Sequence, residues 1–131
     1  AELQTGAKSN VTKVANTYAN KIPNKILSDL FRDNMLLLGI DYPEEKETKT
    51  SGASTDFGNV SQIMPALSAY INLGNVVLHS PDGAKATGTP RAYDFMIMGS
   101  KWIAFTAIDL LTNADKLEKA KAEHKDLVKT K

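Results

Sequence analysis

The chain has 131 residues and no cysteine, and its sixteen basic residues nearly balance fifteen acidic ones, for a formal net charge of +1. These values exclude a disulfide scaffold, a thiolate metal site and a cysteine nucleophile, and they show no basic excess of the kind that nucleic-acid binding requires. With 42% hydrophobic residues, the chain has enough apolar side chains for one folded domain of ordinary size.

The first forty residues predict one strand and one helix. The strand is expected over residues 9–18, where β-branched and aromatic side chains lie between asparagine-rich spots. The helix is expected over residues 24–38, with Pro23 near its start and Gly39 placed to end it in a left-handed conformation. Its apolar residues recur at helical spacing and indicate a face toward the core: Ile26, Leu27, Leu30, Phe31, Leu37 and Leu38.

Residues 41–53 are polar with mixed charge and predict a loop. This loop is either a linker between domains or part of an active site. Leu67, Ala69, Ile71 and Leu73 then alternate with polar residues and predict a half-buried strand. A short apolar run over residues 76–78 predicts another strand, which ends at His79.

The last forty residues predict two helices. The first covers residues 93–112 and is strongly apolar, and Gly99 within it indicates close packing against a neighbouring element. The second begins at Asn113 as its N-cap and exposes a lysine-rich face. No run of about 18 apolar residues occurs, so no membrane span and no membrane partner are expected.

The chain has two histidines, and they are the candidates for histidine chemistry. His124 lies in a helix rich in lysine and glutamate, which predicts a surface position. His79 follows an apolar run and precedes a turn, where an imidazole can bind zinc or transfer protons. A purely structural role for His79 remains an alternative.

The segment Ser54–Ser61 is dense in small and polar residues. It is either a turn closed by Asx-type hydrogen bonds or a loop that contacts a ligand. The residues that could bind substrate are Ser54, Thr55, Asp56, Gly58 and Asn59.

Three blocks in this order resemble the C-terminal third of a known family. They are Ser54–Ser61 with Pro65, then Leu78-His79-Ser80-Pro81-Asp82, then Thr106-Ala107-Ile108-Asp109-Leu110-Leu111. The family comprises the zinc-dependent metallopeptidases and amidohydrolases related to aminoacylase, carnosinase and aminobenzoyl-glutamate hydrolase (peptidase family M-twenty). The resemblance implies an α/β fold: the C-terminal portion of a mixed sheet flanked by helices. It implies that residues 1–20 end a smaller lid and dimerisation domain and that residues 21–131 belong to the catalytic domain.

The resemblance also implies roles for particular residues. His79 matches the family's last metal ligand, which binds one of two zinc ions in the complete enzyme. The loop around Asp56, with Ser54, Thr55, Gly58 and Asn59, matches the substrate side of the site. The implied partners are a small amide or peptide substrate, the missing N-terminal portion and a second copy in a homo-oligomer. The sequence leaves the compartment open and slightly favours the cytoplasm.

This sequence also lacks several active-site residues of the family. The family's His-x-Asp pair, bridging aspartate and Glu-Glu pair have no match; Glu44-Glu45 stands at the wrong place in the order. One imidazole binds zinc weakly at most, because catalytic sites take three protein ligands. We therefore expect a fragment, inactive alone, of a zinc-dependent amidohydrolase or dipeptidase that cleaves amide bonds of N-acyl amino acids or small peptides. The alternatives are a stand-alone non-enzymatic binding or interaction domain, and an unrelated small α/β binding domain, which a structure with His79 far from the Asp56 loop would support.

Overall fold

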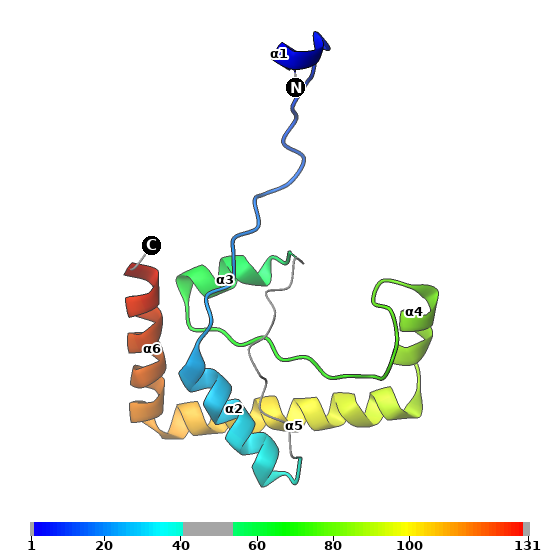
Figure 1. Cartoon of the computed structure of the whole chain (residues 1–131). Coiled ribbons are helices and arrows are strands. Elements are labelled where there is room, and N and C mark those ends of the chain that lie inside the picture. The colour runs from blue at the N-terminus through cyan, green and yellow to red at the C-terminus, as the bar shows by residue number, and fades with distance from the viewer. Residues whose placement is uncertain (1, 41–53, 130–131) are drawn as a thin grey trace.

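The computed structural model describes residues 2–40 and 54–129, and these ranges contain six helices and no strand. The helices are α1 (Glu2–Thr5), α2 (Lys25–Leu37), α3 (Phe57–Ile63), α4 (Pro81–Thr87), α5 (Pro90–Thr112) and α6 (Ala114–Lys129). In Figure 1, α5 runs along one side of the molecule and α2 crosses it, while α6 and α4 lie at opposite ends of α5. The predicted loop over residues 41–53 lies outside the described residues.

The predicted α/β fold is wrong for the part of the chain that is described. Residues 9–18, 67–73 and 76–78 were expected to form strands, and none of them does. A strand requires a hydrogen-bonded neighbour, and no backbone hydrogen bonds join two extended segments within residues 2–40 and 54–129. The alternating pattern of residues 67–73 instead belongs to an irregular segment that packs Leu67 and Ile71 against the core.

Helix α2 confirms its prediction to within one residue at each end. The Asn24 side chain accepts a hydrogen bond from Leu27 N at 3.0 Å and caps the first turn. At the other end, Gly39 N–H donates to Leu36 O and Ile40 N–H donates to Met35 O, both at 3.0 Å. With Gly39 at φ +79°, this is a Schellman motif, and it ends the helix where the glycine predicted.

The N-terminus of α2 is also bound by α6, so segments almost 100 residues apart in the sequence are joined. The Glu123 carboxylate accepts from Lys25 N at 2.9 Å and from Ile26 N at 3.0 Å. Asn24 Nδ2 donates to Ala120 O at 2.9 Å, and Ala120 is fully buried. These bonds satisfy the amides that a helix leaves free in its first turn.

The apolar core is small and lies where α2 meets α5. Phe31 and Trp102 pack edge to face with ring centroids 6.0 Å apart, and Met35 completes the buried cluster. A Cβ placed on Gly99 would lie 3.2 Å from Ile71 Cδ1. The close packing predicted from Gly99 is thus confirmed, and its neighbour is the irregular segment.

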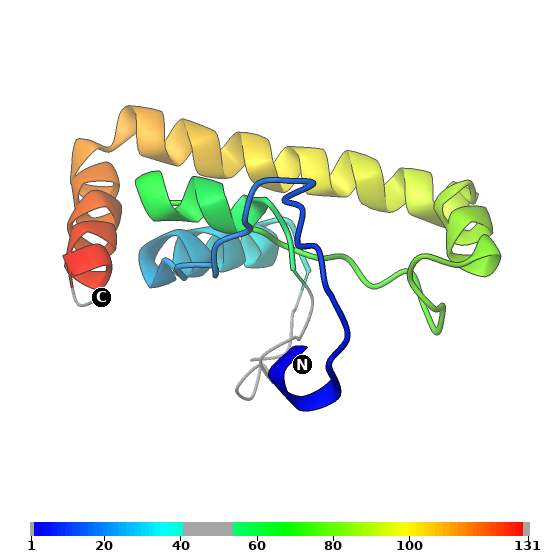
Figure 2. The ribbon, with the colours of Figure 1, turned by 90° about the horizontal axis from the view of Figure 1, so that it is seen from above.

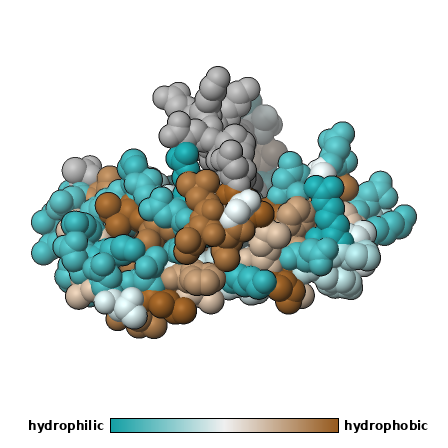
Figure 3. All heavy atoms as spheres, turned by 90° about the horizontal axis from the view of Figure 1, so that it is seen from below, coloured by the Kyte–Doolittle hydropathy of each residue, from teal (hydrophilic) through white to brown (hydrophobic). Residues whose placement is uncertain are grey.

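Helix α5 carries more apolar surface than the described residues cover. Large apolar side chains remain exposed along its length: Tyr93, Met96, Ile97, Ile103, Phe105, Ile108 and Leu111. On the face that Figure 3 views, apolar residues gather in the middle and hydrophilic residues lie toward both ends. Length and composition make α5 the one described helix that could cross a membrane. Core helices of soluble proteins meet the same two criteria. The prediction of no membrane span applied a stricter criterion, an uninterrupted run of about 18 apolar residues.

The N-terminal segment projects away from the helical body (Figure 1). Leu3, Val11 and Val14 are each more than 90% exposed. The Glu2 carboxylate accepts hydrogen bonds from Ser9 N and Oγ, which lower its pKa. Residues 17–22 bind the body through hydrogen bonds to α3. The assignment of residues 1–20 to a lid domain stays a prediction.

Candidate functional site

The predicted substrate segment forms the start of α3. Phe57 N donates to Thr55 Oγ1 at 3.3 Å, and Asn59 N donates to Asp56 O at 2.9 Å. These local bonds turn the chain directly into the helix. Ser54 and Asp56 are exposed and Thr55 is half-buried, so their side chains are open to a ligand.

Gly58 and Asn59 face a different partner, namely the chain's own N-terminal segment. A Cβ added to Gly58 would lie 1.8 Å from Ala19 O. Asn59 Oδ1 accepts from Ala19 N at 2.8 Å, and Asn59 Nδ2 donates to Thr17 O at 3.1 Å. The absence of a side chain at Gly58 thus allows a close approach of the protein's own backbone, in place of the ligand contact that was expected.

Ser61 is the buried centre of this contact. It is 0% exposed, accepts a hydrogen bond from Ile22 N at 2.9 Å and donates to Gly58 O at 2.7 Å. Gln62 Nε2 adds a bond to Asn20 O at 2.7 Å. Sequence reasoning placed Ser61 in the polar segment but not among the residues that could bind substrate; its spacing three residues after Gly58 places both on one helical face.

His124 is half-buried, so its predicted surface position is wrong. Its Nε2 lies 2.8 Å from Ser61 O. That carbonyl is among the last four of α3, which have no partner within the helix. His124 therefore joins α6 to α3.

His79 lies in the turn that leads into α4 and is exposed. Its φ of +57° is the one positive value outside glycine among the described residues; histidine is enriched in this conformation. The turn is held by Ser80, whose Oγ donates to Val77 O at 2.7 Å and accepts from Gly83 N at 3.1 Å. Pro81 then starts the helix. The turn presents the imidazole to solvent, and no strand precedes it.

The structure does not bring His79 together with Ser54–Asn59. Figures 1 and 2 both place α3 beside the half of α5 nearer α6, whereas α4 and its preceding turn lie at the other end. No three His, Asp or Glu residues of the described ranges are grouped so that they could hold a metal ion. Residues 2–40 and 54–129 therefore do not form a zinc site by themselves.

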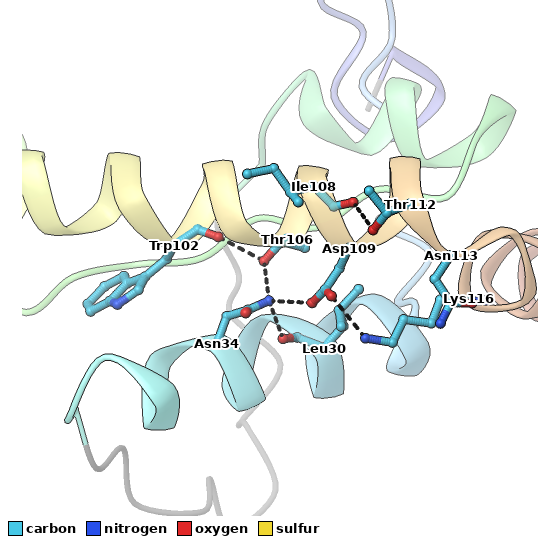
Figure 4. A network of polar contacts seen from close by, with 9 residues as sticks. All are labelled: Leu30, Asn34, Trp102, Thr106, Ile108, Asp109, Thr112, Asn113 and Lys116. Atoms are coloured by element: carbon cyan, nitrogen blue, oxygen red, sulfur yellow. Dashed lines mark hydrogen bonds and ion pairs between the residues drawn. The ribbon is translucent and has the colours of Figure 1, made fainter.

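The third block of the resemblance takes part in a polar network between α2, α5 and α6 (Figure 4). Asn34 Nδ2 donates to Asp109 Oδ2 at 3.0 Å and to Thr106 Oγ1 at 3.3 Å. Lys116 Nζ lies 3.1 Å from Asp109 Oδ1. The hydrogen bond from Asn34, followed by that from Lys116, lowers the pKa of Asp109. These side chains stabilise the packing of the three helices.

An open groove of about 970 Å³ runs between α2, α5 and residues 67–71. Its floor includes Trp102, whose buried Nε1 has no hydrogen-bond acceptor in the described part of the chain. At its rim, Lys21 Nζ lies 3.1 Å from Tyr70 OH and over the Phe57 ring at 5.7 Å. Hydrogen bonds from Ser68 and then Lys21 lower the pKa of Tyr70. The groove is larger than a second recess of about 310 Å³ between α5 and residues 71–73.

Two curated proteins match nearly the whole chain. The Xaa-Arg dipeptidase of Mus musculus is 32% identical over 127 residues, and that of Homo sapiens is 32% identical over 128 residues. Each match covers 95% of this chain but only 30% and 29% of the relative, so the chain spans about a third of the length of the curated relatives it matches. No family model and no solved structure matches the chain.

Proposed function

We propose that this chain is the C-terminal part of a metal-dependent dipeptidase and does not form a complete active site alone. The observation that carries the proposal is the similarity to two Xaa-Arg dipeptidases along 95% of the chain, combined with its 30% share of their length. The separation of His79 from Asp56 favours the alternative of an unrelated domain. That alternative requires the similarity along 95% of the chain to be a coincidence, so we prefer the dipeptidase fragment.

His79 is the residue we propose as a metal ligand, with zinc as the expected ion. Its support is the exposed imidazole in a left-handed turn that Ser80 and Pro81 build around it. Such a backbone conformation is unfavourable for a residue with a Cβ, and strain of this kind gathers at functional sites. The remaining ligands would come from the rest of a longer polypeptide, because one imidazole is insufficient.

The substrate class we propose is a dipeptide of the form Xaa-Arg, after the names of the relatives. Ser54, Thr55 and Asp56 are the residues of this chain proposed to line the substrate side, because their side chains precede α3 and are at least partly open to solvent. Both polar atoms of the Asn59 side chain are engaged by residues 17–19. A direct role for Asn59 in binding would require those bonds to break.

The test compares this chain with the complete polypeptide that its gene encodes. Hydrolysis of Xaa-Arg dipeptides and bound zinc are measured for both, and for His79→Gln and Lys85→Gln in the longer polypeptide. We expect activity and zinc in the longer polypeptide alone, and a loss of roughly 100-fold or more in activity for His79→Gln. Lys85, an exposed residue on α4, provides the matched control and should leave both unchanged. Unchanged zinc and activity in His79→Gln would contradict the assignment.

A stand-alone binding domain is the second candidate. The groove of about 970 Å³ and the lack of a metal-holding group in the described residues favour it. A gene that ends with this chain, together with a monomer of 14.2 kDa, would support this candidate over the peptidase. Light scattering on the same preparation also tests the proposed homo-oligomer.

A further inference from the structure

The start of α3 is held without a side-chain cap. Asp56 occupies the N-cap position, where an aspartate usually accepts a hydrogen bond from an amide of the first turn, but its carboxylate makes no such bond in α3. Backbone bonds close the turn instead: Gly58 N donates to Thr55 O at 3.2 Å, and Asn59 N donates to Asp56 O at 2.9 Å. The exposed Asp56 carboxylate therefore does not fix the helix, and the position of this turn depends on contacts with another segment.

Those contacts come from residues 17–22, which run beside α3 (Figures 1 and 2). Four hydrogen bonds of 2.7–3.1 Å join side chains of α3 to backbone atoms of this segment. Asn59 makes two of them: its Oδ1 accepts from Ala19 N at 2.8 Å, and its Nδ2 donates to Thr17 O at 3.1 Å. Helix α3 thus binds mainly the backbone of the N-terminal segment and depends little on the side chains there.

Asn59 is the residue of this contact that connects it to the proposed substrate side. It lies three residues after Asp56, so the two residues are neighbours across the first turn. Its carboxamide supplies donors and an acceptor, which match a carbonyl and an amide two positions apart in the N-terminal segment. Its own amide is bonded to Asp56 O, and the Gly58 amide is bonded to Thr55 O. A displacement of Asn59 therefore moves Asp56 and Thr55 with it.

We propose that Asn59 is a positioning residue: by binding the backbone of residues 17–19, it holds Thr55 and Asp56 where they bind a dipeptide substrate. The substrate role of Thr55 and Asp56 rests on the proposed function. The Asn59 side chain does not contact substrate itself, because both of its polar atoms are already engaged. Misplacing a group by about 1 Å can cost up to roughly 100-fold in activity, so two hydrogen bonds at this point are enough to control substrate affinity.

Amide exchange resolved by NMR tests the positioning in this chain alone. In Asn59→Ala we expect the amides of Ala19, Gly58 and residue 59 to exchange roughly 10-fold faster relative to those of α2, as the loss of two exposed hydrogen bonds implies. Thr17→Ala is the matched control: this variant keeps the carbonyl oxygen that Asn59 binds and should leave these amides unchanged. Unchanged exchange in Asn59→Ala would overturn the proposal.

Kinetics of the complete encoded polypeptide test the consequence for substrate. For hydrolysis of Xaa-Arg dipeptides, we expect Asn59→Ala to raise KM roughly 10-fold, with kcat within about 2-fold of the parent and bound zinc unchanged. Asn59→Asp should also raise KM, because a carboxylate offers no donor to Thr17 O.

The control for these kinetics is Asn34→Ala. It removes the same carboxamide from the network between α2 and α5, so it should lower stability while leaving KM within about 2-fold of the parent. An increase in KM for Asn59→Ala no larger than that for Asn34→Ala would contradict a positioning role, since loss of stability would then explain both.

A double-mutant cycle separates positioning from direct contact with substrate. In a background that carries Thr55→Ala and Asp56→Ala, Asn59 has no side chain of this pair left to position. Asn59→Ala should then raise KM by less than about 2-fold, against roughly 10-fold in the parent. A 10-fold increase in both backgrounds would overturn the proposal, because Asn59 would then act on substrate by itself.

The exchange and kinetic measurements distinguish the inference from the proposed function. Faster exchange in Asn59→Ala, in a complete polypeptide with neither zinc nor dipeptidase activity, would retain the positioning of α3 by residues 17–19. The same result would refute the proposed function and with it the substrate role of Thr55 and Asp56. An active polypeptide whose KM is insensitive to Asn59→Ala would retain the proposed function and refute the inference.

Discussion

Gly58→Ala tests the contact that binds the N-terminal segment to the helical body. The added Cβ would lie 1.8 Å from Ala19 O and 2.8 Å from Ala19 C, both backbone atoms. No flexible side-chain end can move aside, so α3 and residues 17–22 must separate by more than about 1 Å. Hydrogen bonds of 2.7–3.1 Å between the two segments would lengthen beyond a useful range.

The magnitude follows from those four bonds between α3 and residues 17–22. Each contributes about 0.5–1.5 kcal/mol net, with the exposed bonds at the lower end of that range. Alanine regains about 0.5–1 kcal/mol of helix propensity over glycine. The variant should therefore lower the free energy of unfolding by about 2–3 kcal/mol.

The assay is urea unfolding followed by circular dichroism, with Gly88→Ala as the matched control. A Cβ on Gly88 meets no atom closer than Lys85 O at 3.6 Å, and the residue has a negative φ of −93°. Gly88→Ala should remain within about 0.5 kcal/mol of the parent chain. A Gly58→Ala variant that also stays within about 0.5 kcal/mol would refute the packing of α3 on residues 17–22.

Three further predictions concern Ser61, His79 and Asp109. Ser61→Ala should lower the free energy of unfolding by about 1–3 kcal/mol in urea titrations, because the buried Ile22 amide loses its acceptor; a smaller effect than that of an exposed Ser→Ala variant would argue against the bond. His79→Gly should raise the free energy of unfolding by about 0.5 kcal/mol, and His79→Val should lower it by about 1–2 kcal/mol. The reason is that only glycine adopts a φ of +57° freely. Equal melting temperatures of the two variants would contradict the left-handed turn at His79. The bonded Asp109 carboxyl has a pKa below its ordinary value of 3.8, so its stabilisation is present above about pH 4 and is lost as the pH falls through the lower folded pKa. The stability gap between the parent and Asp109→Asn should therefore close in acid, and a gap independent of pH would contradict the network.

Helices α2, α5 and α6 could be predicted because their signals are local, whereas the short helices α3 and α4 were not predicted. Asn24 and Gly39 mark the two ends of α2 through bonds made within a few residues, and the apolar repeat of α5 follows from its own sequence. The strands could not be predicted correctly, because a strand depends on a neighbour that local sequence does not name. The alternation over residues 67–73 correctly indicated that one side packs against the core, but it contained no information about pairing.

The candidate site residues also differ in whether their contacts could be predicted from local sequence. Gly58 was expected to let the backbone approach a ligand, and the group that lies close to it in the structure is the backbone of Ala19. His124 was assigned to the surface from the charges around it, because its bond to Ser61 O joins residues 63 positions apart. Long-range contacts of this kind leave no mark in the spacing of nearby residues.

The residues around α3 and the turn at His79 differ in what their side chains do. Around α3, the small and polar side chains mainly hold the protein together, through bonds from Asn59 and Ser61 to residues 17–22. The turn at His79 is exposed, and its backbone conformation is one that glycine adopts more easily than histidine. Unfavourable backbone conformations of this kind gather at functional sites. Under the proposed function, the imidazole would bind a metal ion together with residues from the rest of a longer polypeptide.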